Sequence, residues 1–342
     1  MAAFPDPTQR IPILLEKALA VRQPFIDVQH RSALRLFNGF TEGFPDLVVD
    51  LYARTVVIFN HASSHDQEPA HIAAITSWVR SALPWVKAIL VKGRNAPTIE
   101  GRRGYLVYGS RTDDQIEENG VRYAIALQMN ADASFYLDTR NLRAWLKSNL
   151  SGKTVLNTFA YTASLGAAAL AGGARCAVQV DLNRRFLDIG KRTWALNGFK
   201  VKESDFISGD FFRICGQMRR QKQIFDCVII DPPFFSTTRA GKVDLNTSTV
   251  NLVNKVRPLV ADGGWLVVVN NALFVSGASY LADLEGLCQG GYLEIERILP
   301  VPQDITGYLP PQSTSFPADP APFNHSTKIA ILKVRRKDKA VE

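Results

Sequence analysis

The chain has 342 residues, of which 46% are hydrophobic and 21% charged, a composition that excludes a disordered or fibrous protein. At this length we expect two domains, because one core of ordinary size takes about 100–200 residues. Lysine and arginine exceed aspartate and glutamate by eight, which favours an anionic partner such as RNA or simply reflects a basic surface.

The cysteines and the N-terminus indicate a cytoplasmic protein. The four cysteines (Cys176, Cys215, Cys227 and Cys288) are widely spaced without a C-x-x-C pair, which predicts reduced thiols and neither a disulfide framework nor a metal site. The first ten residues lack a basic-then-apolar signal pattern, and no apolar run approaches the roughly 20 residues that cross a bilayer. We therefore expect no membrane partner, and a monomer or homodimer.

Residues 1–125 are predicted to form a small α+β domain. Helical periodicity marks two segments, 11–21 and 70–83, and strand-like apolar runs mark three others, 47–51, 55–60 and 88–91. Short strand-like pieces follow, and Asn119–Gly120 between two of them is a strong hairpin signal.

Residues 126–342 are predicted to form a doubly wound, mostly parallel sheet, because short apolar strands alternate with helices of about 10–15 residues. The predicted strands are 154–157, 176–180, 204–208, 225–230 and 265–269; the predicted helices are 162–171, 184–197, 211–219 and 244–256. A helix at 277–288 and two strands, 292–299 and 328–334, complete the chain.

No helix separates the last two predicted strands, so the final strand can pair antiparallel with its predecessor. A doubly wound sheet with one reversed strand near its edge is typical of class I methyltransferases, whereas a nicotinamide-binding domain would continue with crossovers. The fold class expected is therefore α/β of that type, preceded by the smaller α+β domain.

Polar residues follow three of the predicted strands at the edge where a ligand crevice forms. The loop after strand 154–157 lets the backbone approach a ligand. Asp181, after strand 176–180, has the position from which a carboxylate binds a ribose diol. Asp210, after strand 204–208, can approach adenine. Each has a structural alternative, an ordinary turn for the loop and a helix N-cap for the aspartates. These cofactor-site candidates are Asn157, Phe159, Tyr161, Thr162, Asp181, Leu182 and Asp210.

The most specific motif is Asp231–Pro232–Pro233–Phe234, directly after the apolar strand 225–230. Two prolines cannot continue a central strand and hold a stiff, extended turn. The turn leaves Asp231 and backbone carbonyls facing the crevice, with Phe234 available to stack on a flat base. We predict that Asp231, Pro232, Pro233 and Phe234 form the catalytic loop, with Asp231 also near the cofactor.

On these residues the chain resembles the family of bacterial 23S ribosomal RNA methyltransferases that includes RlmI and the RlmK half of RlmKL. The resemblance runs from Arg35–Leu36–Phe37–Asn38 to the Asp-Pro-Pro-Phe loop. It implies S-adenosylmethionine as cofactor and large-subunit ribosomal RNA as substrate. The segment 134–143 resembles the family's Phe-Leu-Asp-x-Arg lead-in, and by that similarity Phe135, Asp138 and Arg140 become cofactor-site candidates.

The chain departs from RlmI-type enzymes in two respects. Too few residues precede Arg35 for their N-terminal RNA-binding PUA module. Cytosine-C5 enzymes also need a nucleophilic thiolate after the fifth strand, where this chain has Asn270–Asn271. That pair resembles the RlmK pattern, so guanine N7 or an exocyclic amino group is favoured over cytosine C5, with Asn270 orienting the base.

The sequence thus predicts a methyltransferase that uses S-adenosylmethionine on a nucleic-acid base, most simply in ribosomal RNA. Two alternatives stay open: a methyltransferase of a small molecule or protein, and a module that binds the cofactor or RNA without turnover.

Overall fold

The computed structural model describes residues 7–62, 68–308 and 318–336. It divides into two compact units, of which unit 1 comprises Met1–Leu137 with Pro302–Ser315 and unit 2 comprises Asp138–Val301 with Phe316–Glu342. The division between Leu137 and Asp138 lies beyond the boundary expected after residue 125, and the chain returns to unit 1 once.

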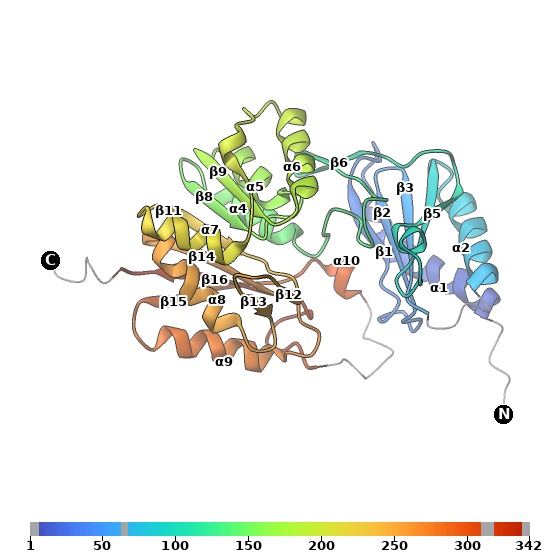
Figure 1. The fold of residues 1–342 in the computed structure, drawn as a ribbon. Helices are drawn as coiled ribbons and strands as arrows, with labels where there is room; N and C mark the ends of the chain where they lie inside the picture. The colour runs from blue at the N-terminus through green and yellow to red at the C-terminus, as the bar shows by residue number, and fades with distance from the viewer. Residues whose placement is uncertain (1–6, 63–67, 309–317, 337–342) are drawn as a thin grey trace. The chain divides into compact units, whose positions relative to one another are not determined.

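Unit 1 is built on a five-stranded sheet in the order β1-β2-β3-β4-β5 (Figure 1). Only β3 and β4 pair in parallel, because helix α2 forms the crossover between them. Apolar residues of α1 and α2 pack on one face of this sheet and form its core. The bounds are α1 Pro7–Arg22, β1 Ala33–Phe37, β2 Leu47–Tyr52, β3 Thr55–Asn60, α2 Glu68–Ala82, β4 Ala88–Gly93 and β5 Tyr105–Tyr108.

The predicted hairpin is confirmed. Strands β6 (Gln115–Glu118) and β7 (Val121–Ala124) pair antiparallel around Asn119–Gly120. Both turn residues have positive φ, 53° and 73°, as a type I′ turn requires. Two short helices complete this part of unit 1, η1 (Gln23–Phe25) and α3 (Ile99–Arg103).

Residues 126–137 belong to unit 1 because its sheet holds their backbone. The buried Lys92 ammonium on β4 donates to the carbonyls of Asn130 (2.7 Å) and Asp132 (3.2 Å), and the Tyr52 hydroxyl on β2 donates to that of Phe135 (3.2 Å). Helix α10 (Gln303–Thr306) joins the same unit, since its Asp304 carboxylate accepts from the Arg35 backbone N–H at 3.0 Å.

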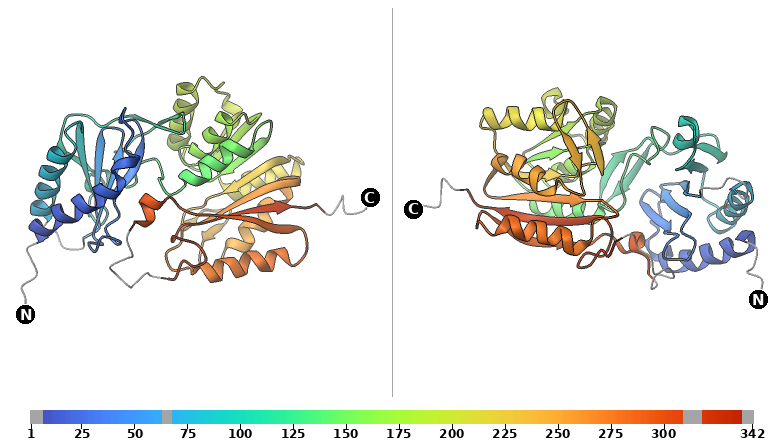
Figure 2. Two further views of the ribbon diagram at one scale, coloured as in Figure 1. Left: turned by 180° about the vertical axis from the view of Figure 1, so that it is seen from behind. Right: turned by 60° about the horizontal axis from the view of Figure 1, so that its bottom comes forward.

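Unit 2 contains a seven-stranded sheet in the order β10-β9-β8-β11-β14-β16-β15 (Figure 2). Strands β10, β9, β8, β11 and β14 are parallel, and β16 runs antiparallel to both β14 and β15. The expectation of one reversed strand near the edge is therefore confirmed. The bounds are β8 Thr154–Thr158, β9 Cys176–Asp181, β10 Phe206–Ser208, β11 Phe225–Ile230, β14 Val260–Asn270, β15 Leu293–Leu299 and β16 Lys328–Val334.

Six helices of eight or more residues flank the described part of this sheet. Helices α4, α5 and α6 contact one another in sequence order, and α7, α8 and α9 form a second such series whose apolar residues share a core with the sheet. Their bounds are α4 Arg140–Asn149, α5 Ser164–Ala171, α6 Arg184–Leu196, α7 Phe211–Arg220, α8 Thr249–Val256 and α9 Gly277–Cys288; the 3-10 turns are η2 Glu203–Asp205 and η3 Arg257–Leu259. Across the described ranges, no helix has the length and apolarity to span a bilayer.

The helix predicted at 244–256 is wrong in its first turn. Residues Phe235–Thr237 (β12) and Lys242–Asp244 (β13) form an antiparallel hairpin, and α8 begins only at Thr249. Asp244 ends β13 and caps a turn, because its carboxylate accepts from the Asn246 N–H and its carbonyl accepts from the Ser248 N–H. This hairpin extends the Asp-Pro-Pro-Phe loop outward from the sheet.

Candidate active site

Asp181 lies at the carboxyl end of β9, where it orders the loop that follows β8. One carboxylate oxygen accepts from the Tyr161 backbone N–H and the other from that of Asn183, both at 2.8 Å. Burial raises the pKa of Asp181, and these two hydrogen bonds oppose the rise. Each oxygen keeps a further lone pair, which is the capacity a diol ligand requires. The cap of α6 comes from Asn183, whose side chain accepts from the Arg185 N–H.

The loop after β8 has an alternating backbone. Phe159, Tyr161 and Ala163 have positive φ values of 56°, 49° and 62°, although none is glycine. Positive φ is costly for such residues and is concentrated at ligand sites. Alternation of negative and positive φ turns successive N–H groups toward one concavity, which suits an anion such as a carboxylate. The Phe159 ring stacks on Phe211 at 4.5 Å between centroids, and Thr162 is buried.

A buried amide pair supports this loop from below. Asn157 on β8 donates to the Gln179 side chain on β9 at 2.8 Å, and both side chains are almost fully buried. Asn157 Oδ1 and Gln179 Nε2 have no hydrogen-bond partner, which is costly inside a protein. Helix α5 passes close by, since a Cβ at Gly166 would lie 2.2 Å from Gln179 Nε2.

Asp210 is the N-cap of helix α7, the structural alternative given for it from the sequence. Its carboxylate accepts from the Arg213 N–H at 2.9 Å at the start of α7, and its second oxygen accepts from the Thr238 hydroxyl. Contact with adenine stays a prediction for Asp210. Leu182, directly after Asp181, has 61% of its surface exposed and offers an apolar face at this edge.

Asp231 directly follows β11, near the carboxyl ends of β8 and β14, because Ile230 pairs with Thr158 and Val268. It is half-buried, and burial together with the negative charge of Asp138 raises its pKa to about 7. Among the residues that the structure describes, none donates a hydrogen bond to its carboxylate. Pro232 is buried, Pro233 is exposed and Phe234 is 42% exposed, so the loop presents a carboxylate beside an accessible ring.

The asparagine pair at the end of β14, Asn270 and Asn271, forms hydrogen bonds to two neighbouring loops. Asn270 is fully buried; its amide donates to the Leu245 carbonyl and the Thr249 hydroxyl, both at 3.3 Å, while its oxygen accepts from the Ala272 N–H. Asn271 donates to the Pro232 carbonyl at 3.3 Å. The Asn270 side chain is thus occupied by contacts within the protein, and its contact with a base stays a prediction; the Pro232 carbonyl of the Asp-Pro-Pro-Phe loop likewise accepts from Asn271.

The lead-in residues fall in both units. Phe135 is buried in unit 1, its ring 5.0 Å from that of Tyr123. Asp138 and Arg140 belong to unit 2, where Asp138 accepts from the Thr327 hydroxyl at 2.8 Å and Arg140 opens α4. The structure brings Asp138 close to Asp231, as the effect on the pKa of Asp231 indicates.

Sequence reasoning missed two buried polar residues near the Asp-Pro-Pro-Phe loop. Lys328 opens β16 fully buried, and its ammonium donates to the carbonyls of Ala272 and Ser326; burial lowers its pKa to about 8. Tyr280 on α9 is also buried and donates to the Val268 carbonyl at 2.9 Å. A lysine directly before the apolar run 329–332 was the available signal for the first, whereas nothing local distinguishes the tyrosine.

Cys227 lies in the middle of β11 with no exposed surface, and burial raises the pKa of its thiol far above the usual range. Cys215 is likewise buried, with its pKa raised to about 12. Neither thiol can form the thiolate that attack on a pyrimidine ring requires.

This strand order, together with Asp181 at the end of β9 and the Asp-Pro-Pro-Phe loop after β11, can be compared with known proteins. Residues 99–289 match the model of a family described as S-adenosylmethionine-dependent methyltransferases. The chain belongs to this family. S-adenosylmethionine is accordingly its cofactor, and the resemblance stated from the sequence is confirmed.

Curated methyltransferase relatives extend beyond this chain. The protein named Ribosomal RNA large subunit methyltransferase I of Aeromonas salmonicida is 29% identical over 257 residues, which cover 74% of this chain and 64% of that protein. The protein of the same name from Alteromonas mediterranea is 30% identical over 228 residues, covering 66% and 57%. The chain thus spans less than two thirds of the length of these two relatives.

Two solved structures share the fold. A protein described as a methyltransferase, solved in complex with S-adenosylhomocysteine, superposes with a TM-score of 0.83 at 22% identity, over 96% of this chain and 82% of that one. A structure from Streptococcus mutans, described as a methyltransferase dependent on S-adenosylmethionine, gives 0.81 at 23% identity over 96% and 81%. The predicted class I methyltransferase fold is confirmed.

The residues of unit 2 fit the cofactor chemically. Asp181 keeps acceptor capacity for the ribose hydroxyls, and the alternating backbone at 159–163 gathers N–H groups for the methionine carboxylate. The two unpaired amide atoms of Asn157 and Gln179 lie beneath the same loop.

Proposed function

We propose that this chain transfers the methyl group of S-adenosylmethionine to a base of large-subunit ribosomal RNA, at an exocyclic amino group or at guanine N7. The names of its curated relatives support the RNA substrate, and the net charge of +8 suits a polyanion. The burial of Cys227 argues against cytosine C5.

One observation carries the choice of atom. The half-buried Asp231 carboxylate has no hydrogen-bond donor among the described residues and lies beside the partly exposed Phe234 ring. An exocyclic amino group would supply that donor, whereas N7 of guanine has a free in-plane lone pair and needs no acceptor. The geometry therefore favours the amino group.

The bound cofactor supplies an electrophilic methyl group, and the protein supplies orientation and a proton acceptor. Phe234 would stack on the base. The Asp231 carboxylate would accept a hydrogen bond from the amino group, which directs the nitrogen lone pair at the methyl carbon. The released proton would pass to Asp231, whose pKa of about 7 suits an acceptor near neutral pH.

The test is mass spectrometry of nucleosides from ribosomal RNA of a strain that lacks this gene. We expect one methylated nucleoside to disappear, to return with the wild-type gene, and to stay absent with Asp231→Ala. Glu285→Gln is the control, because Glu285 is an exposed carboxylate on α9. An unchanged set of nucleosides would reject ribosomal RNA as the substrate.

A further inference from the structure

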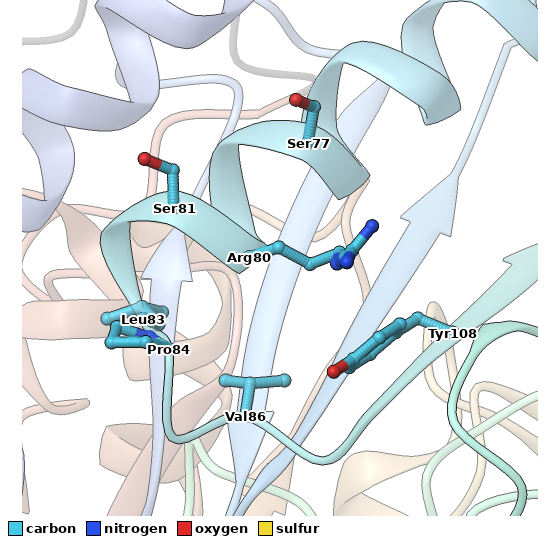
Figure 3. A pocket seen from close by; sticks show the side chains of 7 residues that line it. All are labelled: Ser77, Arg80, Ser81, Leu83, Pro84, Val86 and Tyr108. Atoms are coloured by element: carbon cyan, nitrogen blue, oxygen red, sulfur yellow. The ribbon is translucent and has the colours of Figure 1, made fainter.

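Unit 1 contains a groove that the methyl-transfer chemistry does not use. It has a volume of about 800 Å³ and lies between α2, α3 and β5, with Ile72, Thr76, Arg80, Ala96 and Tyr105 among its lining residues. A neighbouring hollow of about 340 Å³ shares Arg80 and continues to Tyr108 and Val86. Figure 3 shows Arg80 reaching from α2 toward the Tyr108 ring on β5.

Small residues line one side of the larger groove. A Cβ at Gly101 would lie 2.8 Å from the Cβ of Ala96, and one at Gly93 would lie 3.0 Å from the same atom. Side chains at these positions would narrow the space between α3 and β4. Gly93, Ala96 and Gly101 therefore pack closely on one another at one side of the groove, and its other lining residues include the larger Ile72 and Tyr105.

The lining of the groove includes an arginine and a partly exposed tyrosine ring. The Arg80 guanidinium lies 4.9 Å from the centre of the Tyr108 ring, and no carboxylate among the described residues pairs with it. The hydroxyl oxygen of Thr76 is buried without a hydrogen-bond partner. Tyr105, on the edge strand β5, keeps 49% of its surface exposed.

The charge of this segment is strongly positive. Residues 69–108 contain six lysines and arginines against one glutamate. Arg102 and Arg103 of α3 are exposed next to the lining residue Gly101, and neither pairs with a carboxylate in the described part of the chain. An exposed ring beside unpaired arginines is the combination that binds single-stranded nucleic acid by stacking and phosphate contacts.

We propose that this groove binds a single-stranded segment of the RNA substrate, with phosphates at Arg80 and a base stacked on Tyr105. The inference rests on the proposed function for the identity of the RNA. It assigns unit 1 a recognition role at a site separate from the Asp231 loop, and it supplies the chain with an RNA-binding surface of its own.

The binding test uses the full chain and a fluorescein-labelled oligouridine of about 12 nucleotides. We expect Arg80→Ala to weaken binding about fivefold and to lower the slope of log affinity against log salt by about 0.7, the value for one phosphate contact on a single strand. Tyr105→Ala should weaken binding by about tenfold, and Tyr105→Phe should retain it, because stacking needs only the ring. Arg220→Ala is the matched control, an exposed arginine on α7 of unit 2.

A second measurement does not depend on how well the variants fold. Oligonucleotides containing 4-thiouridine, cross-linked to the wild-type chain, should label the peptide that contains Tyr105 and Tyr108. Labelling confined to unit 2, or an Arg80→Ala variant that binds RNA as tightly as Arg220→Ala, would overturn the groove proposal.

The two proposals fail separately. If the gene deletion removes no methylated nucleoside while the groove variants still lose RNA affinity, the ribosomal substrate is rejected and the groove stands. If the nucleoside disappears on deletion but Arg80→Ala retains both RNA affinity and the KM for ribosomal RNA, only the groove is rejected.

Discussion

At Asp231, burial and the neighbouring charge of Asp138 set the protonation state of the one loop carboxylate that has no described hydrogen-bond donor. With a pKa of about 7, it is an acceptor above neutral pH and a protonated acid below. If the acceptor nitrogen is an exocyclic amine, kcat/KM should rise about tenfold per pH unit below pH 7 and level off above it. Initial rates on ribosomal RNA between about pH 5.5 and pH 8.5 measure this profile.

The Asp231→Asn variant should lose about 100-fold or more in kcat while its affinity for S-adenosylmethionine, measured by calorimetry, stays unchanged. A variant that retains the rate would indicate a nucleophile that needs no proton acceptor, as N7 of guanine does.

The same pKa makes a prediction about stability. Because the folded-state pKa of Asp231 lies above the ordinary value of 3.8, the fold favours the protonated form. The stabilising contribution is complete below about pH 4 and is lost as the pH rises through about 7. The difference in Tm between Asp231→Asn and the wild type should therefore be about 5 °C more positive at pH 8 than at pH 4, after allowance for solvent screening. Equal Tm differences at both pH values would contradict the burial of this carboxylate.

Among the elements, helix α5 and strands β8 and β9 pack together next to the loop that follows β8. Gly166 gives α5 the room to pass the buried Gln179 side chain, which is held by Asn157. In Gly166→Ala the new methyl group would meet an amide that is fully buried and cannot move into solvent. We expect a loss of about 2 kcal/mol in the free energy of unfolding.

Gly216→Ala is the matched control. Gly216 also lies inside a helix, α7, but its new Cβ would meet only the Arg220 side chain at 3.7 Å. Alanine should there raise the free energy of unfolding by about 0.5–1 kcal/mol, because it reduces the freedom of the unfolded chain. Urea unfolding of both variants, at equal protein concentration, decides the point; a stabilised Gly166→Ala would mean that the amide pair can rearrange.

The sheet of unit 2 was predictable because its central strands β8, β11 and β14 contain apolar runs and because no long helical pattern separates the last two strands. The β12–β13 hairpin was not, since its strands have three residues each and its exposed Phe235 resembles any loop residue. In the candidate site, Asp181 and Asp231 follow directly from their places after strands. The partners of Asn270 at residues 245 and 249 lie across the fold, and no local pattern specifies them.

At the scale of the whole molecule, unit 1 is formed by two separate parts of the chain, and most of unit 2 lies between them in the sequence. Residues 302–308 return to unit 1. In α10 the Asp304 carboxylate accepts from the Arg35 N–H, and the Thr306 carbonyl accepts from the Thr41 hydroxyl at 3.1 Å. No sequence pattern predicts this return, because it depends on hydrogen bonds between residues more than 260 positions apart.

Asp304 therefore tests whether the returning segment stabilises unit 1. Its carboxylate is almost fully buried and accepts from the Arg35 N–H on the edge strand β1. Asp304→Ala leaves that N–H without its acceptor and should lower the free energy of unfolding by about 1–3 kcal/mol, whereas Asp304→Asn keeps an oxygen in place and should lose less. Hydrogen exchange should show lost protection in β1 and unchanged protection in β8 and β11 of unit 2. Protection of β1 in Asp304→Ala equal to that in the wild type would mean that this hydrogen bond does not stabilise the sheet of unit 1.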